Sequence, residues 1–400
     1  MKKLLQNLTI MLVSLAVTFG VCEIATRLLV PEQMSVKAVS AKKTFTDGPT
    51  KDVQGTDGTI MTVIDWSKAA EKGIRLYPNV NATIQQHMLS KQQVVLRINS
   101  YGMRGPQLGP KEPGEFRVLN LGDSITFGDY LDEAFTIPHL IQQKIGPQTS
   151  KVTILNAGLP GSNSADEYYH YLEIQDVVKP DLVLVGMYLN DAQESGKFYA
   201  KTLRFPFSQS RFLTWVVQRF QLVDSEKLFG GMRGKTVDES WREKFRNGRE
   251  LKAGYMTERR DGFDFEIYNA HKDFGLAWNP EGWVQLRKIM GTFAQIVHQN
   301  GQEFAAYLFP VRMQIYANDE ALSTMPQDSF TAMCKDIKIP CLDLLPLLRE
   351  EVRSKNIKEQ DLFYDHCHYR AAGNEIVADK IAAWLVKENL LKPAAKAPAA

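Results

Sequence analysis

Short, mainly apolar runs without polar alternation recur along the chain from residue 116 onward. Three of them, RVLNL at 117–121, KVTILNA at 151–157 and DLVLVGMY at 181–188, are separated by helical patterns near 139–145 and at 165–178. A strand that is apolar on both sides is covered on both sides, which is typical of a parallel sheet between helices. The pattern therefore predicts a β-α-β-α-β unit in this part of the chain.

The alternation resumes after a long insertion at about 191–278. We expect a helix near 281–299, strands in EFAAYLF and PCLDL, and a final helix at 371–388. These elements predict an α/β fold, a three-layer α/β/α sandwich with right-handed connections. The domain is taken as residues 116–390, and PAAKAPAA belongs to a disordered tail at 391–400.

The first thirty residues differ from the rest. Leu4 to Cys22 carries no charge, and as a helix it is long enough to cross the roughly 30 Å hydrocarbon layer of a bilayer. Lys2 and Lys3 precede this run, so the positive-inside rule places the rest of the protein on the far side. No small-x-small cleavage site follows, which favours an uncleaved anchor over a cleaved signal peptide. We therefore expect a transmembrane helix within residues 1–30 and an exported main domain.

Residues 31–115 connect the expected anchor to the sandwich. The stretch 31–75 mixes Lys, Thr, Asp and Gly with little periodicity, as in a stalk or a loosely packed lead-in. In 81–100, two β-prone stretches around a Ser-Lys turn predict a hairpin. The following YGMRGPQLGPKEPGE is dense in Gly and Pro, which predicts a loop.

Composition narrows the functional classes. The 400 residues are 44% hydrophobic and 24% charged with a formal net charge of +2, which suits a globular chain with an ample core. Neither this charge nor any motif is that of a nucleic-acid binder. Cys334 and Cys341 flank a short KDIKIP connection and form either a disulfide, which an exported protein permits, or two buried thiols.

Five residues that local structure does not require follow the expected strands or precede a helix. They are Ser124 in LGDSITFG, Gly161 in NAGLPGSN, Asn190 in MYLND, and Asp365 and His368 in DHCHYRAAG. In an open parallel sheet this edge is where ligands bind. Ser124 is either a helix N-cap or an exposed nucleophile, although the GxSxG elbow is absent.

A serine hydroxyl becomes a strong nucleophile only beside a base that a third group holds. Asp365 and His368 supply such a pair, three residues apart in one loop. The alternative, a helix-capping Asp beside a surface His, is weakened because this loop follows the last expected strand. Gly161 and Asn190 would donate hydrogen bonds to an oxyanion, at about 3 kcal/mol each. Turn-forming Pro-Gly and strand-ending Asn-Asp are the alternative explanations of these two residues.

The run from Asp365 to His368 also contains good zinc ligands. Its spacing differs from that of most zinc sites, and no second ligand cluster appears among the other histidines, which are His87, His139, His170, His271 and His298. We therefore expect neither metal nor cofactor. Cys367 is interpreted as a small buried residue, and His366 as a neighbour that shapes the pocket.

With these segments in this order, the chain resembles the SGNH (GDSL-type) hydrolase family over about 116–385, the insertion excepted. GDSITFG, NAGLPG, MYLND and DHCH are similar to its first, second, third and fifth blocks. The resemblance implies a flavodoxin-like sheet of order 2-1-3-4-5, Ser124 as nucleophile, and Asp365 and His368 as its partners. It also implies three oxyanion donors: the backbone N–H groups of Ser124 and Gly161 and the side chain of Asn190. Tyr188 departs from the family, which usually has glycine there.

The segment RINSYGMRGP and the N-terminal anchor resemble a membrane-tethered bacterial subgroup that is often linked to surface polysaccharides. We therefore expect a membrane-anchored serine esterase, exported to the periplasm or cell surface, that removes acyl groups, most simply O-acetyl, from carbohydrate or cell-envelope polysaccharide. The alternatives are a polysaccharide O-acyltransferase that uses the same triad, a lipid deacylase, and a non-catalytic glycan-binding envelope protein.

The insertion at about 191–278 is expected to set specificity. Residues 197–260 contain fifteen Lys and Arg against seven Asp and Glu, so they would attract an anionic polymer or anionic lipid headgroups. Trp215, Trp241, Tyr255 and Tyr268 would stack on sugars. The alternative is a solvated helical cap whose aromatic residues pack beneath it.

Overall fold

The computed structural model describes residues 11, 14, 17–25, 51–55, 74–85, 87, 89–145, 151–192, 274–278, 280–316 and 324–391. The chain divides into two compact units. The first comprises 1–40 and 197–234, and its described residues are helical and end at 25. The second comprises 41–196 and 235–400 and contains everything described below.

Several predictions from the sequence concern residues outside these described ranges. Within the described ranges, no helix is long and apolar enough to cross a membrane. Most of the segment from Leu4 to Cys22 lies outside those ranges, so the anchor stays a prediction. The basic stretch 197–260, the four insertion aromatics and residues 392–400 also lie outside the described residues. Leu391, which the sequence pattern places in the tail, is buried.

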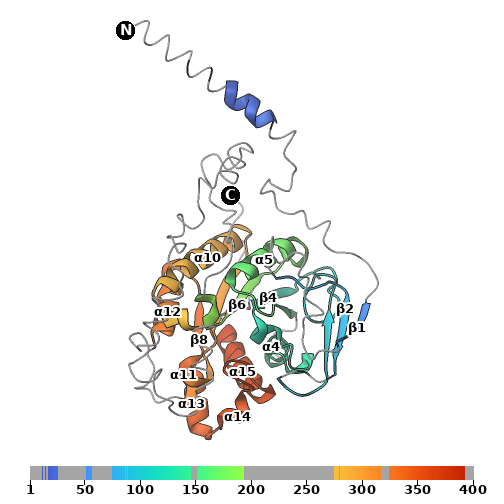
Figure 1. Ribbon diagram of the computed structural model, residues 1–400, viewed down its shortest axis with the longest axis vertical. Helices are drawn as coiled ribbons and strands as arrows, with labels where there is room; N and C mark the ends of the chain where they lie inside the picture. The colour runs from blue at the N-terminus through green and yellow to red at the C-terminus, as the bar shows by residue number, and fades with distance from the viewer. Residues whose placement is uncertain are drawn as a thin grey trace. The chain divides into compact units, whose positions relative to one another are not determined.

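A five-stranded parallel sheet forms the centre of the second unit (Figure 1). Its strands are β4 (Phe116–Gly122), β5 (Val152–Gly158), β6 (Leu182–Met187), β7 (Glu303–Leu308) and β8 (Cys341–Asp343). They are arranged β5-β4-β6-β7-β8, which is the order 2-1-3-4-5 that the family resemblance implied. Every residue of β4 and β6 is buried, as their mainly apolar sequences predict, and in β4 this includes Arg117 and Asn120.

Helices cover both faces of this sheet and confirm the three layers (Figure 1). On one face α4 (Ile137–Ile145) packs against α15 (Ala371–Lys387). On the other, α10 (Pro280–Gln299) contacts both α5 (Ser164–Val178) and α12 (Met325–Ile337). The other helices are α3 (Ser124–Phe127), α11 (Arg312–Tyr316), α13 (Leu345–Lys355) and α14 (Glu359–Leu362).

The short helices α11 and α14 were not expected from the sequence, nor were two longer ones, α12 and α13. α12 lies between β7 and β8, and α13 follows β8, so the DHCH loop comes after α13 and α14 rather than directly after the last strand. Each of the two has a proline in its first turn, a position that a helix tolerates because the first N–H groups have no partner within it. A disulfide between Cys334 and Cys341 joins α12 to β8, which decides between the two alternatives for these cysteines.

A second, three-stranded sheet precedes the main one and is built from β1 (Lys51–Gly55), β2 (Val80–Ile84) and β3 (Val94–Ile98). β2 and β3 are antiparallel, as the predicted hairpin requires, and β1 pairs with β2 in parallel. β1 was missed because KDVQG has no apolar alternation and is recruited through backbone pairing. Phe127 and Leu159 of the main domain complete the core of this sheet, which therefore packs onto the sandwich.

β5 ends against the backbone of α3. A Cβ on Gly158 would lie 2.5 Å from the backbone nitrogen of Phe127 and 2.8 Å from its Cα. Backbone atoms cannot rotate away, so Gly158→Ala is expected to lower the free energy of unfolding by about 1–3 kcal/mol in urea denaturation. Gly109→Ala is the control, because a Cβ there meets nothing within 4 Å. Equal losses in the two variants would contradict this packing.

Candidate active site

Ser124 is the first residue of α3, immediately after the turn that ends β4. Gly122 in that turn has a φ of 152°, and a Cβ there would lie 2.8 Å from the carbonyl oxygen of Gly186, so only glycine fits. The side chain of Asp123 caps the helix by accepting the N–H of Ile125 at 2.9 Å. Because Asp123 is the N-cap, capping does not explain the serine at 124.

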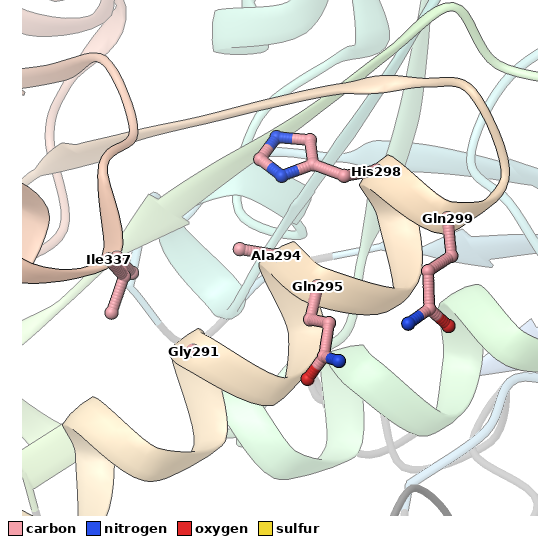
Figure 2. A pocket seen from close by; sticks show the side chains of 6 residues that line it. All are labelled: Gly291, Ala294, Gln295, His298, Gln299 and Ile337. Carbon is pink, nitrogen blue, oxygen red and sulfur yellow. The ribbon is translucent and has the colours of Figure 1, made fainter.

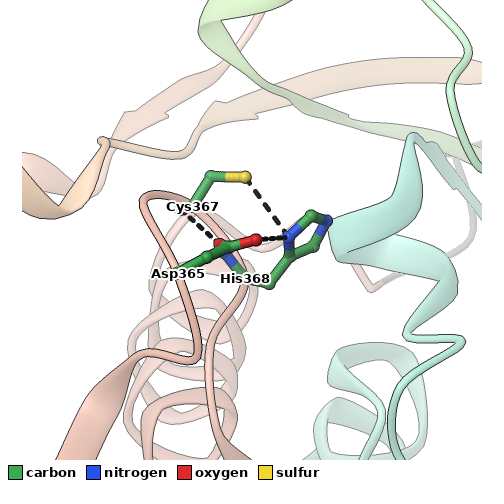
Figure 3. A group of neighbouring side chains, drawn as sticks. All are labelled: Asp365, Cys367 and His368. Atoms are coloured by element: carbon green, nitrogen blue, oxygen red, sulfur yellow. Dashed lines mark hydrogen bonds and ion pairs between the residues drawn. The ribbon is translucent and has the colours of Figure 1, made fainter. Parts of the chain in front are cut away.

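The structure brings the hydroxyl of Ser124 to the imidazole of His368. Ser124 Oγ lies 2.9 Å from His368 Nε2, although 244 residues separate them in the chain. On the other side of the ring, His368 Nδ1 lies 2.7 Å from Asp365 Oδ2 (Figure 3). These three predicted residues therefore form one continuous line of hydrogen bonds.

The loop that carries the base is fixed by its own backbone. Asp365 Oδ1 accepts the backbone N–H groups of Cys367 and His368 at 2.9 and 2.8 Å, so the carboxylate is anchored before it meets the imidazole. The N–H of Tyr364 donates to the carbonyl oxygen of His368 at 2.8 Å and closes the loop. Three residues of separation are therefore enough to hold the carboxylate and the ring in register.

Asp365 dominates the electrostatics of the imidazole. Burial alone would lower the pKa of His368, but the hydrogen bond and charge of Asp365, helped by the charges of Asp129 and Asp123, raise it to about 9. Burial also opposes the ionisation of Asp365, yet the hydrogen bond and charge of His368 hold the pKa of this carboxyl far below its ordinary value. The site therefore stabilises the imidazolium form that proton abstraction from a serine creates.

Gly161 lies in a loop that is tied to the turn before Ser124. The N–H of Leu159 donates to the carbonyl oxygen of Gly122 at 2.8 Å, and the hydroxyl of Ser162 donates to the same oxygen at 3.4 Å. Gly161 has a φ of 74°, in the left-handed region that favours glycine. Gly161 therefore lies in a loop that is hydrogen-bonded to Gly122, two residues before Ser124.

Asn190 follows β6 in a short 3-10 turn over Leu189–Ala192. Its side-chain oxygen is buried and has no hydrogen-bond partner among the residues that the structure describes. The neighbouring Asp191 accepts the N–H and O–H of Ser164 at 2.6 and 2.7 Å and the N–H of Tyr188 at 2.9 Å. Asp191 thus ties the Asn190 turn to the start of α5, just beyond Gly161.

Sequence reasoning missed two residues that shape this site. The sequence offers a signal for Asp191, because it directly follows Asn190 and a carboxylate after a strand can accept the backbone N–H groups of a turn. Tyr130 gave no such signal: its ring is fully buried and packs edge-on against His368, with centroids 5.0 Å apart. Tyr188, the departure from the family pattern, is buried beside Phe274 with ring centroids 6.4 Å apart, so the core accommodates it.

The residues that suggested zinc are engaged otherwise. Asp365, Cys367 and His368 each offer one ligand atom within 4.8 Å of the others (Figure 3). Cys367 is buried, as expected, and its Sγ lies 3.5 Å from His368 Nδ1, the nitrogen that faces Asp365. A metal bound through Nδ1 would replace that hydrogen bond. His366 stacks on Phe274 with ring centroids 5.6 Å apart.

A hollow of about 460 Å³ lies elsewhere, between α10 and the end of α12 (Figure 2). Its lining residues are Gly291, Ala294, Gln295, His298, Gln299 and Ile337. The hollow is at the end of α10 that leads into β7, whereas Ser124 and Asn190 follow the carboxyl ends of their strands. It is therefore separate from the candidate active site.

No family model matches the chain, and no curated protein matches its sequence. Solved structures are similar at low identity. TesA is 13% identical with a TM-score of 0.38, over 67% of this chain and 97% of its own. The acetyl xylan esterase AlAXEase is 16% identical with a TM-score of 0.36, over 67% and 98%. A catalytic mutant of Axe2, an acetylxylan esterase from Geobacillus stearothermophilus, is 13% identical with a TM-score of 0.39, over 69% and 96%.

The link that Asp191 makes can be tested by changing one atom. In the wild type the carboxylate accepts hydrogen bonds from Ser164 and Tyr188. In Asp191→Asn one of its oxygens is replaced by an amide NH₂ group, which is itself a donor and faces those donors. The free energy of unfolding is therefore expected to fall by about 1–3 kcal/mol in urea denaturation. Asp343→Asn is the control, because Asp343 accepts the N–H of Leu345 at 2.9 Å and the side-chain oxygen of asparagine can do the same. A stable Asp191→Asn variant would show that the link is dispensable.

Proposed function

We propose that the protein is a serine esterase that forms an acyl-enzyme on Ser124. The observation that supports this most strongly is the line of hydrogen bonds from Asp365 through His368 to Ser124, with lengths of 2.7 and 2.9 Å. A glycan-binding module would have no use for a nucleophile paired with a base. Such a line is what converts a weak alcohol nucleophile into a reactive one.

In the proposed cycle, Ser124 Oγ attacks the ester carbonyl carbon while its proton passes to His368 Nε2. Asp365 keeps the other ring nitrogen protonated and stabilises the imidazolium. His368 then returns the proton to the departing alkoxide, and the alcohol leaves. A water molecule, deprotonated by the same nitrogen, attacks the acyl carbon. The bond from that carbon to Ser124 Oγ then breaks, His368 returns the proton to Oγ, and the carboxylic acid leaves.

The negative oxygen of the tetrahedral intermediate needs fixed donors. We assign this role to the backbone N–H groups of Ser124 and Gly161 and to the side-chain amide of Asn190. The bonds from the Leu159–Ser162 loop to Gly122, and from Ser164 to Asp191, support the assignment because they hold the three donors on adjoining turns. Preorganised donors of this kind are worth about 3 kcal/mol each.

The finer proposal is that the ester is an O-acyl group, most simply O-acetyl, on carbohydrate or cell-envelope polysaccharide outside the cytoplasm. The family resemblance supports the substrate class. The apolar segment from Leu4 to Cys22 and the Cys334–Cys341 disulfide support a membrane-anchored, exported enzyme, because disulfides persist in oxidising compartments. Free acetate as product would indicate hydrolysis, and an acetylated glycan would indicate transfer to a sugar hydroxyl.

Replacing the nucleophile tests the proposal. Ser124→Ala is expected to lower kcat for p-nitrophenyl acetate by at least about 10³-fold, because no acyl-enzyme can form. Its melting temperature should stay close to that of the wild type, since Asp123 caps α3. Ser354→Ala, which removes an exposed hydroxyl, is the control and should keep full activity. Undiminished hydrolysis by purified Ser124→Ala protein would overturn the assignment.

The pH dependence should follow His368, because only the neutral imidazole accepts the serine proton. Asp365 raises the pKa of His368 to about 9, so kcat/KM is expected to rise with pH through the alkaline range. Asp365→Asn removes the group that raises this pKa, so burial then lowers it and the rise moves to more acidic pH, while kcat falls by about 10⁴-fold.

The matched control for this experiment is Asp361→Asn, an exposed carboxylate in α14 that should leave the pH profile unchanged. A profile that keeps the same alkaline rise in Asp365→Asn would show that another group controls it.

A further inference from the structure

Arg104 is a buried cation in the loop that follows β3. Only 3% of its surface is exposed, and its backbone N–H donates to the carbonyl oxygen of Asn156 in β5 at 3.0 Å. The guanidinium donates to the carbonyl oxygens of Phe127 at 2.9 Å, of Leu131 at 2.5 Å and of Gly128. Because a guanidinium is a rigid planar fork of donors, it holds the three carbonyls in one fixed arrangement.

Two of these carbonyls end the helix that carries the nucleophile. Phe127 is the last residue of α3, and Gly128 caps it by donating its N–H to the carbonyl oxygen of Ser124 at 2.8 Å. The last carbonyls of a helix have no partner within it. A helix of four residues makes few bonds of its own, so Arg104 at its end does much to fix where it lies.

The same segment also reaches the base. Tyr130 lies between the Gly128 and Leu131 carbonyls, and its fully buried ring packs on the imidazole of His368. His87, which follows β2, adds a second tie, with its Nε2 3.3 Å from Asp129 Oδ2. The turn 127–131 therefore connects the helix of Ser124 to a wall of the His368 site.

The three-stranded sheet also contacts the loop after β5, which carries the proposed oxyanion donor Gly161. Leu159, two residues before Gly161, lies in the core that β2 and β3 build, together with Phe127. Ile74 Cδ1 would lie 3.6 Å from a Cβ placed on Gly161. The described residues within 74–105, which we name the lead-in segment, thus touch the loops that follow both β4 and β5.

We propose that the lead-in segment is part of the catalytic unit, and that Arg104 is a positioning residue that holds Ser124 and His368 in their reactive geometry through turn 127–131. The proposal rests on the proposed function, since it concerns the same site. The guanidinium of Arg104 is buried and donates to main-chain carbonyl oxygens, so it acts through them. Its role is to set the distance between the nucleophile and the base.

Arg104→Lys tests this, because lysine keeps the charge but loses the planar fork. The matched control is Arg117→Lys. Arg117 is also buried, at 2% exposed, and donates to the carbonyl oxygens of Val178 and Gly109 at 3.1 and 2.9 Å, but it lies at the opposite end of β4. Both variants lose a buried guanidinium, and Arg117→Lys also disturbs a pair with Glu115 at 2.8 Å, so loss of stability alone does not explain an effect confined to Arg104→Lys.

Arg104→Lys is expected to lower kcat for p-nitrophenyl acetate roughly 30- to 100-fold, with KM within about threefold of the wild type, because a small misplacement of reacting groups has that effect. Folded Arg117→Lys should keep kcat within about twofold. The proposal is overturned if folded Arg104→Lys keeps its kcat, or loses no more of it than Arg117→Lys does.

A second pair of variants leaves the arginine in place. Tyr130→Phe keeps the ring and removes only a hydroxyl that has no partner among the described residues, so its kcat should fall less than that of Tyr130→Leu. Tyr130→Leu removes the ring and should lower kcat at least about tenfold, with little change in KM. Full activity of Tyr130→Leu would overturn the role of turn 127–131.

The two proposals fail in different ways. Wild-type protein that hydrolyses no ester would overturn the proposed function. The positioning role then still has a readout, because the ¹⁵N signals of the His368 ring should move in Arg104→Lys and stay in place in Arg117→Lys. Unmoved signals in Arg104→Lys would overturn the positioning role alone.

Discussion

The hydrogen bond between Ser124 and His368 is the constraint on which the site depends. It joins the end of β4, the first strand of the main sheet along the chain, to the loop between α14 and α15, 244 residues later. The parallel arrangement makes this possible, since every crossover returns the chain so that strands end at one edge. The intervening helices and strands serve to bring these two side chains together.

Close packing beneath this edge keeps the loops in place. Gly186 of β6 has no room for a side chain, because a Cβ there would lie 2.6 Å from the hydroxyl of Tyr307. That hydroxyl accepts a hydrogen bond from the side chain of Asn120 at 3.1 Å in the middle of the sheet. The loops that carry Ser124 and Asn190 therefore start from strands that cannot shift relative to each other, which is the kind of rigid support that preorganised donors require.

Features that leave a local pattern in the sequence can be predicted from it. The five strands appear as apolar runs, and Ser124, Asp365 and His368 stand out because no local structure needs them. Features that depend on contacts distant in sequence are not predictable in this way. β1 joins its sheet by pairing with β2 although its sequence has no apolar alternation. α12 and α13 each begin with a proline in the first turn, which in a sequence suggests a break. Arg104 shows its role only when its three carbonyl partners come together. The segment from Leu4 to Cys22 stays a prediction from composition.

The most direct test of the central claim is the mass-spectrometric localisation of the adduct formed by a fluorophosphonate on the intact protein at about pH 8. We expect one phosphonyl group per chain, on the peptide that contains Ser124, and none on folded His368→Ala protein, because the serine is reactive only beside its base. An adduct on another residue, or no adduct on folded wild-type protein, would contradict a nucleophile at Ser124.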